Sequence, residues 1–205
     1  MVKLLDFCKR SIQKNMKTKK SYLLFPLAAM LFAMFACNIF VGGPDYPTQT
    51  VPISADEVQN MYTQIEQSFS AGAETGIVTL QITESQLTSL IALKLQEQTD
   101  PPFTDPQVLL RDGKLQMYGK KVSGSFTANI LITASVGIDE TTGMPKIEVS
   151  SVDLGPIPAP EGLNAAINAM IAEAFTGSLG PAATGFRLES ITVADGVMTM
   201  TGRIK

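Results

Sequence analysis

Two periodicities of apolar and polar residues divide the chain into predicted strands and helices. In several stretches apolar side chains recur at every second position, which predicts β-strands, because successive strand residues point to opposite faces of a sheet. These stretches are 77–82, 108–119, 125–138, 146–154 and 188–203. Elsewhere apolar residues recur at every third and fourth position, which predicts amphipathic helices that begin near Ser54, near Glu84 and after Pro160.

The predicted helices have recognisable ends. The first begins at Ser54-Ala55-Asp56-Glu57, which has the form of a capping box, and Gly72 and Gly76 are expected to end it. A second capping box, 83–86, opens a helix that should stop before Asp100. The apolar stripes of the three helices are Val58, Met61, Tyr62, Ile65 and Phe69; Leu87, Leu90, Ile91 and Leu95; and Leu163, Ala166, Ile167, Met170, Ile171, Ala174 and Phe175.

Two Asp-Gly pairs predict tight β-hairpins, one at 112–113 and one at 195–196. A type I′ turn needs positive φ at both central residues, and Asp and Gly tolerate this conformation. Residues 108–120 and 191–203 match in pattern position by position, and each stretch follows a predicted amphipathic helix. This similarity indicates a duplicated helix-plus-hairpin unit, although Asp-Gly hairpins are common enough for two of them to match by chance.

The order of these elements indicates one α+β domain over residues 54–205: a curved antiparallel β-sheet with amphipathic helices packed on its concave face. On the long strand 125–138, every even-numbered position from Phe126 to Ile138 is apolar. The layer between sheet and helices is either an ordinary packed core or a groove for an apolar ligand, and the pattern leaves both open. Candidate lining residues of such a groove are Leu87, Leu90, Ile91, Phe126, Ile130, Ile132, Met170 and Phe175.

The N-terminal region has the layout of a bacterial lipoprotein signal. Three lysines precede an apolar run over 23–37, and the run ends in Cys37, at the position of the cysteine that is acylated in such signals. Met34 and Phe35 fit the usual cleavage box imperfectly. The alternative is an uncleaved membrane anchor over 22–43, since an apolar run of about 20 residues can span a bilayer.

These observations divide the chain before the folded domain into two parts. Residues 1–36 are expected to be an export signal, with Met16 as an alternative start, and 37–53 to be the acylated cysteine followed by a flexible tether. Prolines and glycines within 42–53 resist both helix and strand. The lysines before the apolar run should remain in the cytoplasm, which places the folded domain on the outer side of the bacterial cell membrane.

Composition narrows the chemistry that the protein can perform. The chain has no histidine and no tryptophan, and no cysteine follows Cys37. These absences exclude a Ser-His-Asp triad, and in residues 38–205 they exclude a disulfide framework, a Cys/His zinc site and a catalytic thiol. No clustered carboxylates suggest another metal or cofactor, so we expect none.

The charge of the exported part limits its partners. Residues 37–205 contain nine basic and eighteen acidic residues, which gives a net charge of −9. Nucleic-acid binding is therefore not expected, because a basic surface supplies most of that affinity. Broad electrostatic adhesion to anionic lipid headgroups is not expected either.

Two stretches resemble small bacterial envelope proteins of the TULIP-like (tubular lipid-binding) type. They are Ile82-Thr83-Glu84-Ser85-Gln86-Leu87-Thr88-Ser89-Leu90, which leads to a hairpin, and Leu188-Glu189-Ser190-Ile191-Thr192-Val193-Ala194-Asp195-Gly196-Val197-Met198. The resemblance covers roughly residues 77–204. It implies a strongly curved sheet that wraps a long helix and holds lipid between them, an anchor in the membrane, and no catalytic residues.

Two functional hypotheses follow. The first is a non-enzymatic envelope lipoprotein, held in the membrane by an acyl chain such as palmitate on Cys37 or by an N-terminal helix, that binds a lipid or other apolar ligand between sheet and helices. The second is a structural or interaction domain with a filled core that binds an envelope protein. A continuous groove between the layers would favour the first hypothesis.

Overall fold

The computed structural model describes residues 39–140, 143, 145–156, 165, 169 and 186–204. Residues 40–205 form a compact unit of their own, and the fold reported below is that of this unit. The helices described are α2 (Ala55–Thr75) and α3 (Glu84–Gln96). The strands described are β1 (Ile39–Phe40), β2 (Ile77–Thr83), β3 (Thr104–Arg111), β4 (Lys114–Ser123), β5 (Phe126–Ile138), β6 (Pro145–Asp153), β7 (Phe186–Ala194) and β8 (Val197–Ile204). The predicted lipoprotein signal and the apolar stripe of the predicted third helix lie outside the described residues.

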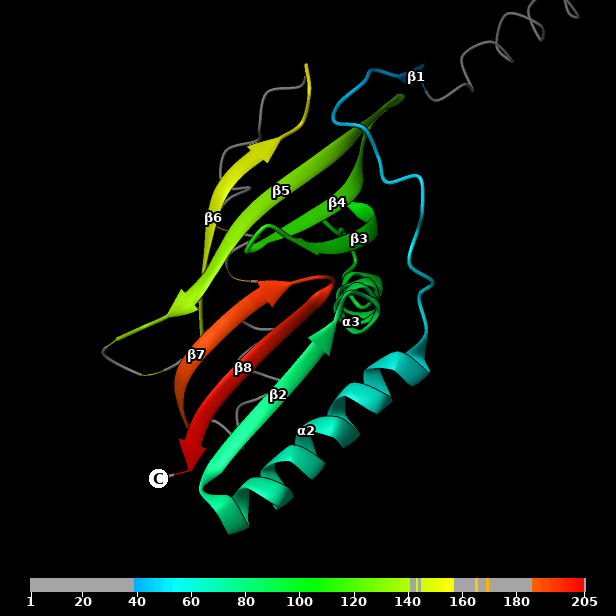
Figure 1. Cartoon of the computed structure of the whole chain (residues 1–205). Coiled ribbons are helices and arrows are strands. Elements are labelled where there is room, and N and C mark those ends of the chain that lie inside the picture. Colours follow the sequence, from blue (N-terminus) through cyan, green and yellow to red (C-terminus); the bar gives the residue numbers. More distant parts are fainter. Residues whose placement is uncertain are drawn as a thin grey trace, which may run out of the picture. The chain divides into compact units, whose positions relative to one another are not determined.

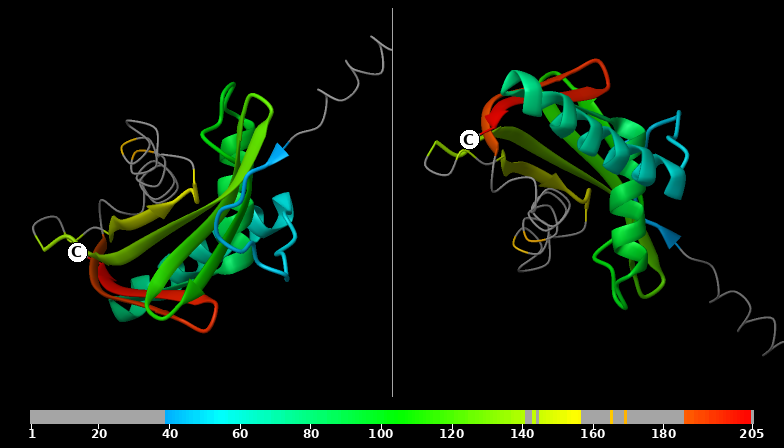
Figure 2. Two further views of the ribbon diagram at one scale, coloured as in Figure 1. Left: turned by 90° about the horizontal axis from the view of Figure 1, so that it is seen from above. Right: turned by 90° about the horizontal axis from the view of Figure 1, so that it is seen from below.

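The strands form an α+β fold with a strongly curled, mostly antiparallel half-barrel (Figure 1). One part has the order β1-β5-β4-β3, with β6 also paired to β5, and the other has the order β2-β8-β7. Two backbone hydrogen bonds join the parts: Gly196 N donates to Leu110 O, and Leu188 N donates to Gly143 O, each at 3.2 Å. The curl is visible when the unit is viewed along its length (Figure 2).

The predicted strand alternation is confirmed where the sheet has one covered face. On β2 the buried residues are Val78, Leu80 and Ile82, and the last two lie opposite buried Met200 and Met198 of β8. On β5 the buried even-numbered positions run from Ala128 to Ala134. A period of two therefore identified the inward-facing side chains of both strands.

Both predicted Asp-Gly hairpins are confirmed. Asp112 and Gly113 have φ values of 52° and 71°, and Asp195 and Gly196 have values of 53° and 81°. Positive φ at both central positions is the type I′ requirement, and its twist matches that of the flanking strands. The first turn joins β3 to β4, and the second joins β7 to β8.

Helix α2 departs from its prediction at both ends. Ser54 is the N-cap and accepts a hydrogen bond from Asp56 N, but Glu57 Oε2 accepts one from Ser85 Oγ of α3 at 3.0 Å. The helix passes through Gly72 and ends at Gly76, so the prediction that Gly72 ends it is wrong. Gly72 is a close-approach site instead, because a Cβ there would collide with Cγ2 of Val78.

Helix α3 has the predicted capping box, with the Thr83 and Gln86 side chains each bonded to the other residue's backbone. Its apolar stripe is buried as predicted, but its polar residues Gln86, Thr88 and Ser89 are buried as well. Thr88 Oγ1 accepts a hydrogen bond from Val108 N of β3 at 3.0 Å, and Ser89 Oγ accepts one from Ser54 N at 3.1 Å. These bonds satisfy the polar groups of a helix that is enclosed on nearly all sides.

The segment 42–53 has neither helix nor strand, as predicted, but it is bonded to the sheet rather than hanging free as a tether. Gln107 of β3 bonds both the N–H and the carbonyl of Val51, at 2.6 and 3.2 Å. Asn129 of β5 donates from Nδ2 to Pro44 O at 2.9 Å. Side-chain amides thus supply the backbone partners that an irregular segment needs.

Candidate functional site

Most of the predicted groove-lining residues that the structure describes belong to one filled core. Leu87, Leu90 and Ile91 of α3 share a buried cluster with Ile130 and Ile132 of β5. None of these side chains is more than 7 % exposed, so they line no groove that is open to solvent. The side chains that were expected to hold a ligand instead pack against one another between α3 and the sheet.

The remaining predicted residues are not brought into this cluster. Phe126 is 49 % exposed, because it lies opposite Ser123 at the end of the β4–β5 hairpin, outside the buried cluster. Met170, Phe175 and Cys37 lie outside the described residues.

A second apolar surface continues from the core onto β6. It consists of partly buried side chains that pack against the core, and we call it the β5–β6 face: Val136, Ile138, Ile147, Val149 and Val152. The register places Ile147 opposite Val136, Val149 opposite Ala134, and Val152 opposite Ile132. All of these residues therefore lie on the inward side of the sheet, whereas Glu148 and Lys146 lie on its other side.

A β-bulge keeps this surface continuous. The register shifts between the Ala134–Val149 pair and the Thr133–Ser151 pair, which leaves Ser150 as an extra residue on β6. The extra residue reverses the alternation, so that Val152 returns to the same side as Val149. The alternating pattern predicts a simple strand over 146–154. The one signal of the bulge is the spacing of Val149 and Val152, which are three residues apart instead of two.

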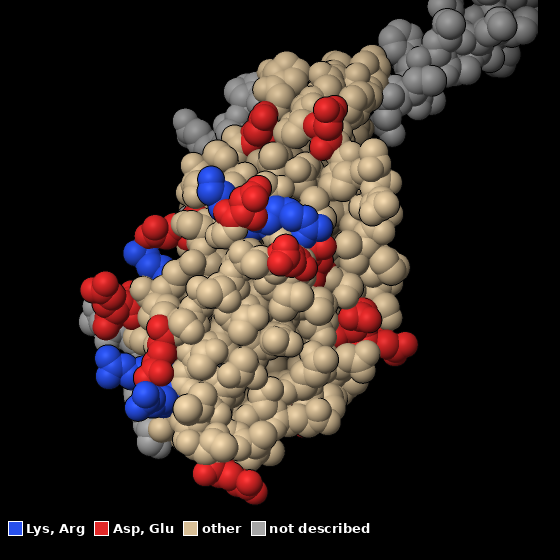
Figure 3. Space-filling model, in the orientation of Figure 1, with Lys and Arg blue, Asp and Glu red and all other residues tan. Residues whose placement is uncertain are grey.

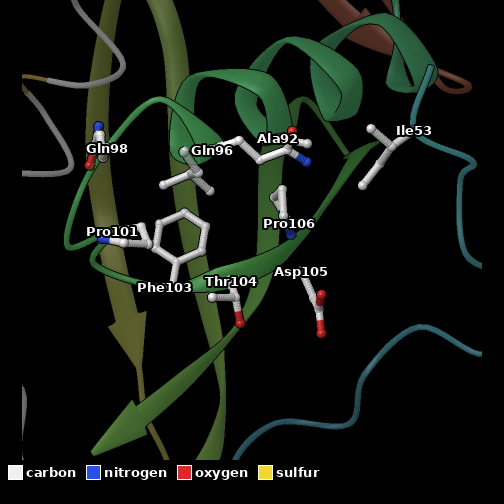
Figure 4. Close-up of a pocket in the computed structure, with 10 residues that line it drawn as sticks. Ile53, Ala92, Gln96, Gln98, Pro101, Phe103, Thr104, Asp105 and Pro106 are labelled. Carbon is white, nitrogen blue, oxygen red and sulfur yellow. The ribbon is translucent and has the colours of Figure 1, made fainter. Parts of the chain in front are cut away.

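A pocket of about 260 Å³ lies beside the C-terminal end of α3 (Figure 4). Leu95 of the helix, Phe103 of the following loop and Pro106 of β3 contribute apolar walls, and Ile53 closes one side. Asp105 is the charged residue of the lining, and its carboxylate is paired with Lys120 Nζ at 3.0 Å. The pocket can therefore accept a small apolar group but offers no free charge for catalysis.

A wider depression of about 420 Å³ lies between α2 and β2. Amides and hydroxyls dominate its lining, which includes Gln64, Gln67, Thr79 and Gln81. In Figure 3 the surface over α2 is largely uncharged between acidic side chains near its two ends. This depression has no aromatic or ionised group that would select a ligand.

Glu84 holds the start of α3 against the sheet through its carboxylate and its backbone. Glu84 Oε1 accepts a hydrogen bond from Leu110 N at 2.6 Å, and the same carboxylate pairs with Arg111. Its backbone N–H donates to Gly196 O, so this residue links α3 to the tips of both Asp-Gly hairpins. Burial, and secondly the carboxylate of Asp105, raise the pKa of Tyr46 to about 12, which keeps this phenol neutral.

In the described part of the chain, no three His, Cys, Asp or Glu side chains are placed to hold a metal ion. The same residues include no helix that is both long enough and apolar enough to cross a bilayer. No family model and no curated protein matches the chain.

Sequence reasoning missed the polar contacts of Gln107, Asn129 and Thr88. An isolated polar residue in an apolar pattern does not reveal its hydrogen-bond partner.

Proposed function

We propose that this protein is a non-enzymatic, extracytoplasmic lipoprotein that binds an apolar ligand, such as a lipid acyl chain, on the β5–β6 face. The observation that carries the proposal is the partial burial of this face: in the part of the chain that the structure describes, it continues from a closed core, but its own side chains are not fully buried. Ligand sites are typically concave and apolar with few polar groups. The acidic charge of residues 37–205 favours a ligand held by apolar contact rather than by its headgroup.

The proposed ligand site differs from the predicted one, which lay between the helices and the sheet. Helices α2 and α3 would cover one part of the concave face and fill it, while the β5–β6 face would remain for the ligand. Between β6 and β7 the sequence carries the predicted amphipathic stripe with Met170 and Phe175. The similarity of 108–120 to 191–203 supports a duplicated helix-plus-hairpin origin for the fold.

Anchoring at Cys37 is the second part of the proposal. The lysine-rich start and the apolar run 23–37 support it, and the absence of histidine supports a role without acid–base catalysis. Because the anchor would hold the protein at the bilayer, an acyl-chain ligand would have a short path to the β5–β6 face.

Native mass spectrometry of the full chain, followed by organic extraction, tests ligand binding. Val149→Asp places a charge on the β5–β6 face, and Ser151→Asp places the same charge on the other side of the same strand. We expect the wild type and Ser151→Asp to carry an extractable lipid, and Val149→Asp to lose it. Val149→Trp, which fills the same space without adding charge, should also lose the lipid while keeping the fold.

The alternative function is an interaction domain with a filled core, and the tight packing of Leu87, Leu90 and Ile91 favours it. A wild-type protein that is free of bound mass, and that stays so after incubation with envelope lipids, would contradict ligand binding and favour this alternative.

A further inference from the structure

One end of the folded unit carries exposed apolar side chains that no core contact explains. Val122 and Phe126 flank the turn between β4 and β5, and each is 49 % exposed. Phe40 is 60 % exposed, and the neighbouring Val41 N donates to Thr127 O at 2.9 Å. This bond places Phe40 beside the start of β5, at the end of the unit where β1 meets the β4–β5 turn (Figure 1). We call Phe40, Val122 and Phe126 the apolar tip.

The β4–β5 hairpin, which carries Val122 and Phe126, contains no acidic residue. Its lysines are not all at the tip: Lys114 lies at the far end of β4, and Lys120 Nζ is paired with the Asp105 carboxylate at 3.0 Å, which leaves Lys121 near the turn. Residues 37–205 together carry a net charge of −9. An anionic surface repels an apolar end with little net charge less than it repels the acidic remainder of the body, and this difference would orient the protein.

Two aromatic rings with polar ends lie together, one on this hairpin and one on the segment 42–53 beside it. Tyr46 meets Tyr118 in an edge-to-face contact with centroids 6.2 Å apart, and Lys120 Nζ lies 5.3 Å from the centre of the Tyr46 ring. Tyrosine and lysine are the side chains that place an apolar stem in the interface and a polar end in water.

The apolar tip is close to the proposed anchor, Cys37, along the chain. Phe40 follows Cys37 by three residues. Even a fully extended chain spans at most about 3.6 Å per residue, so three residues reach about 11 Å. The residues after Phe40 are held to β5, because Gly42 O accepts a hydrogen bond from Asn129 N at 3.0 Å and Pro44 O accepts one from the Asn129 side chain.

We propose that the apolar tip is a membrane-docking surface: Phe40, Val122 and Phe126 enter the headgroup region of an anionic bilayer, and Lys121 lies among the headgroups. This inference rests on the membrane anchoring in the proposed function, but not on ligand binding. It gives the anchored domain a fixed orientation, with the start of β2 and the C-terminal end of α2 directed away from the bilayer.

The absence of tryptophan from the chain makes a direct test available. Phe126→Trp creates a single reporter in the tip, and Ile77→Trp creates a matched reporter at the start of β2, where the native side chain is 50 % exposed. Figure 1 places the start of β2 at the opposite end of the unit from the β4–β5 turn. The full-length variants are reconstituted in vesicles of equal parts phosphatidylglycerol and phosphatidylcholine, with and without bromine on the acyl chains.

We expect brominated lipid to quench the indole emission of the Phe126→Trp variant severalfold. The emission of this variant should also shift to shorter wavelength in the vesicles, while the emission of the Ile77→Trp variant is unchanged. Adding Lys121→Glu to the Phe126→Trp variant should weaken the quenching.

Vesicle flotation of the same samples separates the two proposals. A Phe126→Trp chain that floats without quenching, or a pair of reporter variants quenched equally, overturns docking and leaves anchoring intact. A chain that does not float overturns both.

Discussion

The two parts of the inward side of the curled sheet differ in how completely they are closed. Around α3 even polar side chains are buried, and each has a hydrogen-bond partner, as Thr88 has in Val108. On the β5–β6 face the apolar side chains are only partly buried, although they lie on the same inward side of the sheet. The difference in burial distinguishes a closed core, which supplies stability, from the β5–β6 face, which is the ligand surface in the proposed function.

Matched isoleucines in the two regions should give the largest difference. Ile132 is 1 % exposed in the core, and Ile147 is partly buried on the β5–β6 face. We expect Ile132→Ala to lower the free energy of unfolding by about 2–5 kcal/mol, because it leaves a cavity. Ile147→Ala should cost roughly 1 kcal/mol, since its site is already partly solvated. Urea unfolding measures both, and equal losses would contradict the division into a closed and an open region.

Overpacking tests the border between the regions. Ala134 is fully buried on β5 and lies opposite Leu115 on one side and Val149 on the other. We expect Ala134→Phe to cost about 1–3 kcal/mol, because a closed core cannot take the added volume without strain. Ser135→Phe, on the other side of the same strand, should change stability by less than about 0.5 kcal/mol. A stable Ala134→Phe variant would show that the closed core ends before this residue.

The sequence predicted the parts of the fold that depend on local chemistry. The alternation of β2, the Asp-Gly turns and the capping box of Thr83 were predictable because each involves neighbours along the chain or along one face. The start of α2 was predicted only in part, because Glu57 bonds to Ser85 of another helix instead of completing its own cap. Gly72 was misread for the same reason: its role depends on Val78 across the packing interface.

The site was less predictable than the fold. A period of two assigned Phe126, Ile130 and Ile132 to one side of β5, but it could not tell that the strand extends beyond the buried core at Phe126. Nor could it tell whether the space opposite Ile130 is filled, because that depends on how closely α3 approaches. The β6 bulge, which keeps Val152 on the inward side, depends on pairing with β5 and leaves little trace in the sequence.

A buried hydroxyl provides a more subtle test of the closed core. Thr88→Val keeps the shape of the side chain but removes the acceptor for Val108 N. We expect a loss of about 1–3 kcal/mol, the usual cost of an unsatisfied buried donor. Thr79→Val, on the exposed side of β2, is the matched control and should have little effect. If both variants are as stable as the wild type in thermal unfolding, Val108 N has found another partner and the region around α3 is less closed than its burial indicates.

The smallest expected effect concerns Tyr46, in the segment that docks beside the closed core. Burial and the Asp105 carboxylate raise the pKa of its phenol to about 12 in the folded protein, from an ordinary value of 10.0. Its contribution to stability is therefore complete below pH 10, and it is lost as the pH rises toward 12, because the unfolded chain releases the proton first. Tyr46→Phe should make the fall in stability over that range shallower, and should remove a phenolate step near pH 12 from the ultraviolet titration. If that step persists in Tyr46→Phe, it belongs to another tyrosine. The Tyr46 phenol would then be open to water, and the segment 42–53 would not be part of the closed region.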